Sequence, residues 1–298
     1  MMLAISDVVS LCLIRQPNSH IKIYMNLTGI ILSFLFCIYG YFHAKDIKLK
    51  NYDISIGKDA GDLKDLKAVF IADMHLGEMI KAPELDAIIT QINSLNPDIV
   101  FFGGDIYDEN TPKDLEEYSF NAWHRVESKY GTYYVGGNHE YGISKRINMQ
   151  RVLPQLAKNK VHVLQDESVL IGDAFYLIGR KDAFVEGRAS LVELTRKLDK
   201  NRLTILLDHQ PVELLKAKEA GIDLFLSGHT HGGQIFPIGL LSKLFSKNEL
   251  LYGYQKLDTL QTVVSSGVGV WGFPMRVGTN SEIVVLNIKL KNKENVSS

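Results

Sequence analysis

Five short apolar segments, each running into a polar loop, constrain the fold of this chain more than any other feature of its sequence. They are KAVFIAD (67–73), DIVFFGGD (98–105), TYYVGGN (132–138), TILLDH (204–209) and DLFLSGH (223–229). Each segment has the length and the β-branched or aromatic content of a buried strand. Amphipathic stretches follow several of them, which predicts an α/β domain with buried sheets.

Helices are predicted between these strands, and the end of the chain departs from the pattern. The predicted helical ranges are 83–95, 115–128, 149–158, 191–198 and 211–220. Strand-like TVVSS (262–266) and EIVVLNIKL (282–290) then follow without a helix between them. These two late strands predict a second, more antiparallel sheet layer. The chain has 298 residues, 46% of them hydrophobic, which is enough to bury a large core.

The segment 23–42 carries no charged residue, and its length of about 20 residues is enough to cross a bilayer core of about 30 Å. Tyr24, Tyr39 and Tyr41 lie near its ends, as in the aromatic belts of membrane interfaces. The segment predicts a transmembrane helix in the cell membrane, with a cleaved signal peptide or a buried core helix as alternatives. It is longer than the core of a signal peptide, and no clear A-x-A site follows it.

The charges that flank this segment do not indicate on which side of the membrane the rest of the chain lies. Positive residues lie both before and after it, namely Arg15, Lys22, Lys45, Lys48 and Lys50. Met1–Ile14 is a second apolar stretch, but it contains Asp7 and is not assigned as a span. The predicted organisation is a membrane anchor at 1–44, a linker and an entering strand at 45–66, an α/β domain at 67–290 and a polar tail at 291–298.

Charge and cysteine content exclude several classes of function. The formal net charge is −1, which offers no polybasic field for nucleic acid, so no nucleic-acid partner is expected. Both cysteines, Cys12 and Cys37, lie in the apolar N-terminal region, so the rest of the chain has neither a disulfide framework nor a thiolate metal site. A metal there would be held by imidazole, carboxylate and amide groups, which suit Mn, Fe, Zn or Mg.

Polar side chains with metal-binding chemistry follow all five strand-like segments. They are Asp73 and His75, Asp105, Asn138 and His139, His209, and His229 and His231. Taken singly, an aspartate after a strand is more often a cap or turn residue, and a histidine is more often structural. Because the carboxyl ends of the strands meet at one edge of the sheet, we expect these side chains to converge on a common site.

The ordered motifs D-x-H, G-D-x-x-D, G-N-H-E, H and G-H-x-H resemble those of the calcineurin-like metallophosphoesterase family over about 67–288. The resemblance implies two mixed β-sheets packed as a sandwich flanked by helices. It implies two divalent metal ions, one held by Asp73, His75, Asp105 and His231 and the other by Asp105, Asn138, His209 and His229, with Asp105 as the bridge. His139 holds the general-acid or phosphate-contacting position, Asp108 the position that orients it, and Glu140 a supporting position.

Departures from the best-known branch of the family narrow the expected substrate. Phosphoprotein phosphatases carry a phosphate-gripping arginine after G-D-x-x-D, where this chain has Glu109. GHTHGGQIFP, the apolar N-terminal segment and the late GFPMRVG look instead like the membrane-associated bacterial branch that includes UDP-diacylglucosamine pyrophosphohydrolases. Arg276 in the late segment is a candidate phosphate contact. In that branch a proline is expected before Glu282, where this chain has Asn280 and Ser281. The sequence therefore does not decide whether this chain shares the substrate of that branch.

Two further patterns are interpreted as structural. Gly267, Gly269 and Gly272 match G-x-G-x-x-G, but Pro274 follows and no helical periodicity develops. This stretch predicts a loop bordering the metal site and not a dinucleotide fold. His124 and His162 lie outside the motifs and are also expected to be structural.

Together these features predict a membrane-anchored phosphoesterase that cleaves a phosphodiester or pyrophosphate bond. Its expected partners are the lipid bilayer and a phosphorylated substrate, with a lipid-linked nucleotide such as UDP-diacylglucosamine as the implied candidate. The apolar residues Leu240, Leu241, Leu244 and Phe245, beside Lys243 and Lys247, predict a short element that dips into the interface or packs in the core. The alternatives are a catalytically silent scaffold of the same fold and a nuclease with the same metal site.

Overall fold

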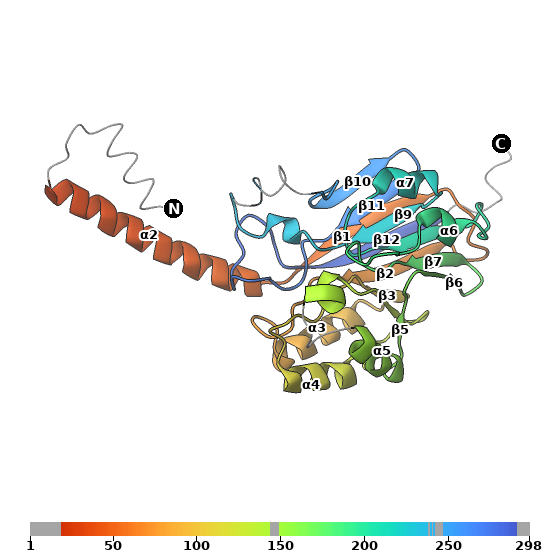
Figure 1. Ribbon diagram of the computed structural model, residues 1–298, viewed down its shortest axis with the longest axis horizontal. Helices are drawn as coiled ribbons and strands as arrows, with labels where there is room; N and C mark the ends of the chain where they lie inside the picture. The colour runs from red at the N-terminus through yellow and green to blue at the C-terminus, as the bar shows by residue number, and fades with distance from the viewer. Residues whose placement is uncertain (1–18, 144–148, 238, 240, 242–246, 291–298) are drawn as a thin grey trace.

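The computed structural model describes residues 19–143, 149–237, 239, 241 and 247–290, and the catalytic domain is built on two six-stranded sheets (Figure 1). The first sheet has the order β1 (Lys48–Ile56), β12 (Glu282–Leu290), β2 (Asp65–Ile71), β3 (Ile99–Phe102), β4 (Thr132–Tyr134) and β5 (Val161–Val163). The second has the order β10 (Gly253–Leu257), β11 (Leu260–Val264), β9 (Leu224–Ser227), β8 (Thr204–Leu207), β7 (Phe175–Gly179) and β6 (Glu167–Ile171). Each contains parallel and antiparallel pairs, so the predicted pair of mixed sheets is confirmed.

Helices cover the outer faces of both sheets. Figure 1 shows three of them below the strands, namely α3 (Ala82–Ser94), α4 (Lys113–Trp123) and α5 (Met149–Lys158), with α6 (Leu191–Thr195) and α7 (Leu214–Glu219) on the other side. These layers form because successive side chains of a strand point to opposite faces of its sheet. In β9, Leu224 and Leu226 enter the core between the sheets, while Phe225 packs with Leu214 of α7 on the outer side.

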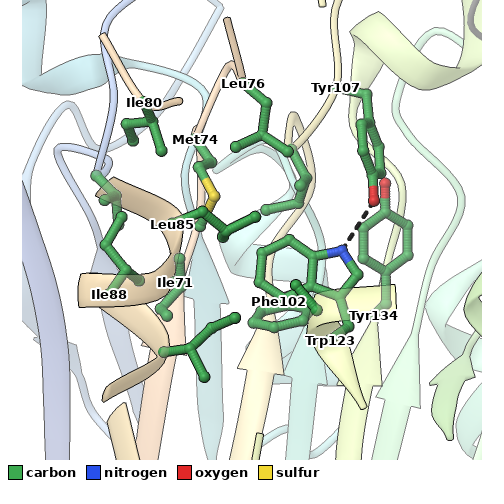
Figure 2. Close-up of a cluster of buried hydrophobic side chains, with 14 of the residues drawn as sticks. Ile71, Met74, Leu76, Ile80, Leu85, Ile88, Phe102, Tyr107, Trp123 and Tyr134 are labelled. Atoms are coloured by element: carbon green, nitrogen blue, oxygen red, sulfur yellow. Dashed lines mark hydrogen bonds between the residues drawn. The ribbon is translucent and has the colours of Figure 1, made fainter. Parts of the chain in front are cut away.

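A cluster of buried side chains under α3 and α4 supports the loops that follow β2 and β3 (Figure 2). Trp123 packs against Phe102 with ring centroids 4.9 Å apart, and its indole nitrogen donates a hydrogen bond of 2.8 Å to the Tyr107 hydroxyl. Met74 and Leu76 belong to the same cluster and are fully buried. The loops that carry Asp73 and Asp105 are therefore anchored by apolar neighbours inside the core.

The N-terminal helix α2 (Ser19–Lys45) projects away from the domain (Figure 1). Its apolar stretch is long enough to cross a membrane, as predicted for 23–42, and only 6% of that stretch is buried. This exposure excludes the alternative of a buried core helix. The second apolar stretch, 1–14, lies outside the described residues.

Several element boundaries differ from those expected from the sequence. The strand β1 lies within 45–66, the range predicted to hold a linker and an entering strand, and it pairs along its whole length with β12, so the sheet begins at Lys48. The predicted helix 211–220 begins only at Leu214, because Glu213 has a left-handed backbone and the Glu249 carboxylate accepts the N–H groups of both residues. The predicted helices 115–128 and 191–198 end early, at Trp123 and Thr195.

Candidate metal centre

The carboxyl ends of parallel strands in both sheets bring the predicted ligands together. Asp73 follows β2, Asp105 follows β3 and Asn138 follows β4, all in the first sheet. His209 and His229 follow β8 and β9 in the second. All seven predicted ligands are buried except His229, which is partly exposed. The site thus lies where the edges of the two sheets meet.

Three overlapping groups of side chains have ligand atoms within 4.8 Å of one another. They are Asp73 with His75 and His231, His75 with Asp105 and His139, and Asp105 with His209 and His229. The first and third groups contain most of the two ligand sets implied by the family resemblance. Asp105 belongs to two groups, which is the position required of a bridging carboxylate.

The backbone of this site is unusual. Five predicted ligands have positive φ: Asp73 (52°), His75 (45°), Asp105 (51°), His229 (71°) and His231 (50°). L-residues rarely adopt this conformation, and each such residue costs on the order of 1–3 kcal/mol. The surrounding core and loop hydrogen bonds must hold these residues in place. Their clustering is typical of a functional site.

Glycines in the motifs allow the loops to approach one another. A β-carbon on Gly137 would collide with the Asp105 carboxylate, and one on Gly228 would collide with the Asp73 carboxylate. The loop containing Gly267 also borders the site, because a β-carbon there would lie 2.7 Å from the Asp73 β-carbon. The predicted loop at 267–272 is confirmed.

Hydrogen bonds fix the orientation of two histidines. The Nδ1 atom of His75 lies 3.0 Å from the Asp108 carboxylate, and Nδ1 of His209 donates to the Gly103 carbonyl at 2.7 Å. Nε2 of His75 is left for a ligand, and Nε2 of His209 is turned toward the Asp105 carboxylate, 3.0 Å away. Within the described part of the chain, three buried atoms of the predicted ligands besides His209 Nε2 lack a hydrogen-bond partner: His75 Nε2, Asn138 Oδ1 and His231 Nδ1. Nitrogen and oxygen donors left unpaired in this way fit a divalent metal.

The electrostatics of the site are dominated by burial and by close pairing of opposite charges. Burial raises the pKa of Asp73 to about 6. Burial acts in the same direction on Asp105, but His209, 3.0 Å from its carboxylate, and other histidines outweigh it and lower the Asp105 pKa. Burial lowers the pKa of His229 to about 4 and that of His231 well below its usual range. These two rings are therefore neutral at pH 7, the form that binds metals.

Glu140 holds two of the site loops together. Its carboxylate is fully buried and accepts hydrogen bonds of 2.8–3.0 Å from the backbone N–H groups of Asp105, Ile106, Tyr107 and Gly137. The side chain thus joins the loop after β3 to the loop after β4. This arrangement agrees with the supporting position expected for Glu140.

The partner of His139 differs from the prediction. The predicted pairing with Asp108 is wrong, because the Asp108 carboxylate contacts His75 instead. Nδ1 of His139 lies 2.9 Å from the Glu109 carboxylate, so the residue that replaces the phosphatase arginine orients this ring. The sequence shows both carboxylates side by side, and only their backbone directions decide which histidine each one meets.

Arg276 is buried in the structure, and its predicted contact with phosphate is wrong. Its guanidinium donates hydrogen bonds to the carbonyls of His231 (2.9 Å), Ser266 (2.8 Å) and Gly269 (2.6 Å). Burial lowers the pKa of Arg276 to about 10, so it stays charged at neutral pH. Arg276 thus ties the H-x-H loop to the loop at 266–269. The pattern GFPMRVG gives no indication of this burial.

A cavity of about 540 Å³ opens over the predicted ligands. Asp105, Asn138, His139, His229 and His231 form its polar part. Phe184, Ile235, Trp271 and Phe273 form an apolar wall that the sequence did not predict. Trp271 lies beside the candidate catalytic histidine, because its ring centroid is 5.7 Å from that of His139. The run WGFP is the only sequence signal for this wall.

Comparison with known proteins agrees with this geometry. The family model described as calcineurin-like phosphoesterase matches residues 66–233, which is more than half of the chain and contains all seven predicted ligands. This chain belongs to that family. The groups of carboxylate and imidazole side chains fit a divalent metal site in a member of this family.

Relatives in this family include bacterial and animal proteins. An uncharacterized metallophosphoesterase of Helicobacter pylori is 37% identical over 77% of this chain and 61% of its own length. One from Campylobacter jejuni is 36% identical over 93% of this chain and 73% of its own length. A Bos taurus protein named transmembrane protein with metallophosphoesterase domain is 33% identical over 75% of this chain and 53% of its own length. The chain thus spans about three fifths of the Helicobacter relative.

Proposed function

We propose that this protein is a membrane-anchored phosphoesterase that holds two divalent ions and hydrolyses a phosphodiester or pyrophosphate bond. The observation that carries the proposal is the set of buried, unpartnered ligand atoms on His75, Asn138 and His231 around the shared carboxylate of Asp105. Divalent ions bound there would lower the pKa of a water toward neutrality and stabilise charge on a phosphate. Asp105, shared by two ligand groups, would hold both ions.

His139 is the residue placed to act on the leaving group. It lines the cavity, and its Nδ1 is engaged by Glu109, which leaves Nε2 to donate a proton or to contact a phosphate oxygen. Glu109 also adds negative charge where phosphoprotein phosphatases carry an arginine. This charge disfavours a dianionic phosphomonoester, so the proposal favours a diester or a pyrophosphate.

The substrate proposed for this site is an amphiphile with its phosphate near the membrane surface. The helix α2 has the length and exposure of a membrane anchor, and the Bos taurus relative is named as a transmembrane protein. The apolar wall of Phe184, Trp271 and Phe273 suits a lipid-linked head group, for which UDP-diacylglucosamine is the model compound. A tethered site meets such head groups at high effective concentration.

The test is an activity panel on the full-length protein in mild detergent with added Mn²⁺, Zn²⁺ or Mg²⁺. It compares a generic phosphodiester, a phosphomonoester and UDP-diacylglucosamine. We expect hydrolysis of the diester or the pyrophosphate, and loss of that activity in Asp105→Asn but not in His162→Gln, a histidine outside the motifs. Full metal content with no hydrolysis of any substrate would favour the silent scaffold. Salt-dependent binding and cleavage of DNA would favour the nuclease.

A further inference from the structure

Three aromatic side chains form an exposed group beside the mouth of the cavity, which we call the aromatic rim. They are Phe236 (57% exposed), Trp271 (51%) and Phe273 (69%). Phe236 follows the H-x-H loop, and the other two lie in the loop that follows β11. Large aromatic side chains exposed together are uncommon on a surface that faces only water.

The backbone under the aromatic rim is well braced. The Gln234 side chain donates to the carbonyls of Trp271 and Phe273 at 3.0 and 3.2 Å and accepts from the Trp271 N–H at 3.0 Å. Phe236 N–H donates to the Val277 carbonyl at 2.8 Å. The two rim loops are therefore joined to each other, and the exposure of their aromatic side chains is built into the fold.

The same loop is docked on the last turns of α2. Arg276 N–H donates to the Gly40 carbonyl at 2.9 Å, and a ring nitrogen of His43 donates to the Arg276 carbonyl at 3.1 Å. The Ser281 hydroxyl donates to the Ala44 carbonyl at 2.8 Å. Gly40 allows close contact, because a β-carbon there would lie only 3.0 Å from that of Met275.

These contacts fix the aromatic rim relative to the predicted membrane boundary. The uncharged segment ends at Phe42, and Tyr39, Tyr41 and Phe42 are exposed at this end of α2. If α2 crosses the bilayer, Gly40 lies within about one helical turn of its surface. Met275, Arg276 and Val277 lie directly against Gly40, and Phe273 is two residues before Met275, so the rim reaches the same level, where aromatic side chains are favoured.

We propose that the aromatic rim inserts into the surface of a phospholipid bilayer beside α2, so that the cavity opens onto the headgroup layer. This inference rests on the proposed membrane span of α2. Trp271 then contacts lipid on one side and lies 5.7 Å from the His139 ring on the other. A phosphoester in the headgroup layer reaches the metal centre without leaving the membrane.

Tryptophan fluorescence tests the contact directly, because the chain has only two tryptophans. Trp123 is 2% exposed in the core and serves as an internal reference, whereas Trp271 is in the rim. The full-length protein is reconstituted into phosphatidylcholine vesicles with or without bromine near the headgroup end of the acyl chains, and flotation confirms binding. We expect the brominated lipid to quench part of the emission, and Trp271→Phe to remove that loss.

A matched control places a tryptophan of similar exposure far from α2. Val192 is 69% exposed on α6, at the end of the domain away from α2 (Figure 1), so Trp271→Phe combined with Val192→Trp should show no quenching. Equal emission in both vesicle types from wild-type protein that floats overturns the rim contact and leaves the span standing. Quenching that persists in Trp271→Phe also overturns it. Protein that fails to float overturns the span, and the rim contact with it.

Discussion

Both ends of the parallel strands carry aspartates, but the carboxylates at the two ends have different partners. At the amino ends, Asp98 precedes β3 and Asp223 precedes β9. The Asp98 carboxylate accepts the N–H of Lys67 at 2.8 Å, and the Asp223 carboxylate accepts that of Thr204 at 2.9 Å. Each aspartate therefore continues the ladder to the neighbouring parallel strand, one in each sheet.

At the carboxyl ends, Asp73 and Asp105 stand on left-handed backbone and are surrounded by histidines. Burial raises the pKa of Asp73 to about 6, as it does for Asp223. Desolvation is thus similar at the two ends, and the difference lies in the partners. Backbone N–H groups donate to the carboxylates at both ends, including those of His229 to Asp73 and of His139 to Asp105. Only at the carboxyl end do further ligand side chains converge on the aspartates, with buried polar atoms left unpaired in the described residues.

The largest expected effect comes from removing one charge at the carboxyl end. Asp105→Asn should abolish activity and lower metal content, because Asp105 is shared by two ligand groups. Turnover and metal analysis by mass spectrometry measure both effects. Asp98→Asn is the matched control at the amino end, and it should keep its activity and metals because an amide oxygen still accepts the Lys67 N–H. Near-normal turnover with full metal content in Asp105→Asn would refute the bridging role.

The next largest effect is expected from His139, and it separates catalysis from metal binding at the carboxyl ends of the strands. His139→Ala should keep its metals and lose on the order of 100-fold or more in kcat, through loss of acid catalysis or charge stabilisation. Single-turnover rates and metal content are measured on the same sample. Loss of the metals in this variant would show instead that His139 is a ligand.

Two adjacent carboxylates should give distinguishable defects. Glu109→Gln should lower kcat by roughly tenfold with metals retained, because its partner is His139. Asp108→Asn should weaken metal binding by roughly 10- to 100-fold, because its partner is the ligand His75. Metal titrations and kcat are compared for both variants. The reverse pattern would restore the pairing of Asp108 with His139.

The smallest expected effect is on stability at the amino end. Burial raises the pKa of Asp223 to about 6. Between about pH 4 and 6, Asp223 is therefore protonated in the folded state and ionised in the unfolded state. This contribution favours folding at low pH and is lost as pH rises. Asp223→Asn should therefore gain stability relative to wild type between pH 4 and 8, by about 3 kcal/mol at most, without changing turnover. Urea unfolding of both proteins at pH 4 and pH 8 measures the difference in unfolding free energy. An equal difference at the two pH values would contradict the prediction.

The metal ligands could be predicted from the sequence because each follows a recognisable strand, and strand ends converge in an α/β fold. An entering strand was predicted within 45–66, but the pairing of β1 with β12, more than 200 residues away, could not be predicted from local sequence. Long-range packing also decided the contacts that were predicted wrongly. Arg276 donates to three carbonyls of two other loops, and Glu109 meets His139 while Asp108 meets His75.

The most direct test of the metal centre is the number of ions that the full-length protein binds. Metal-free protein in detergent is titrated with Mn²⁺, and bound ions per chain are counted by calorimetry and by elemental analysis after gel filtration. Two ions per wild-type chain are predicted, with the same count in Asp98→Asn and a lower count in Asp105→Asn. Wild-type protein that binds no Mn²⁺, Zn²⁺ or Mg²⁺ at millimolar concentration would contradict the assignment of the carboxyl-end side chains as a metal centre.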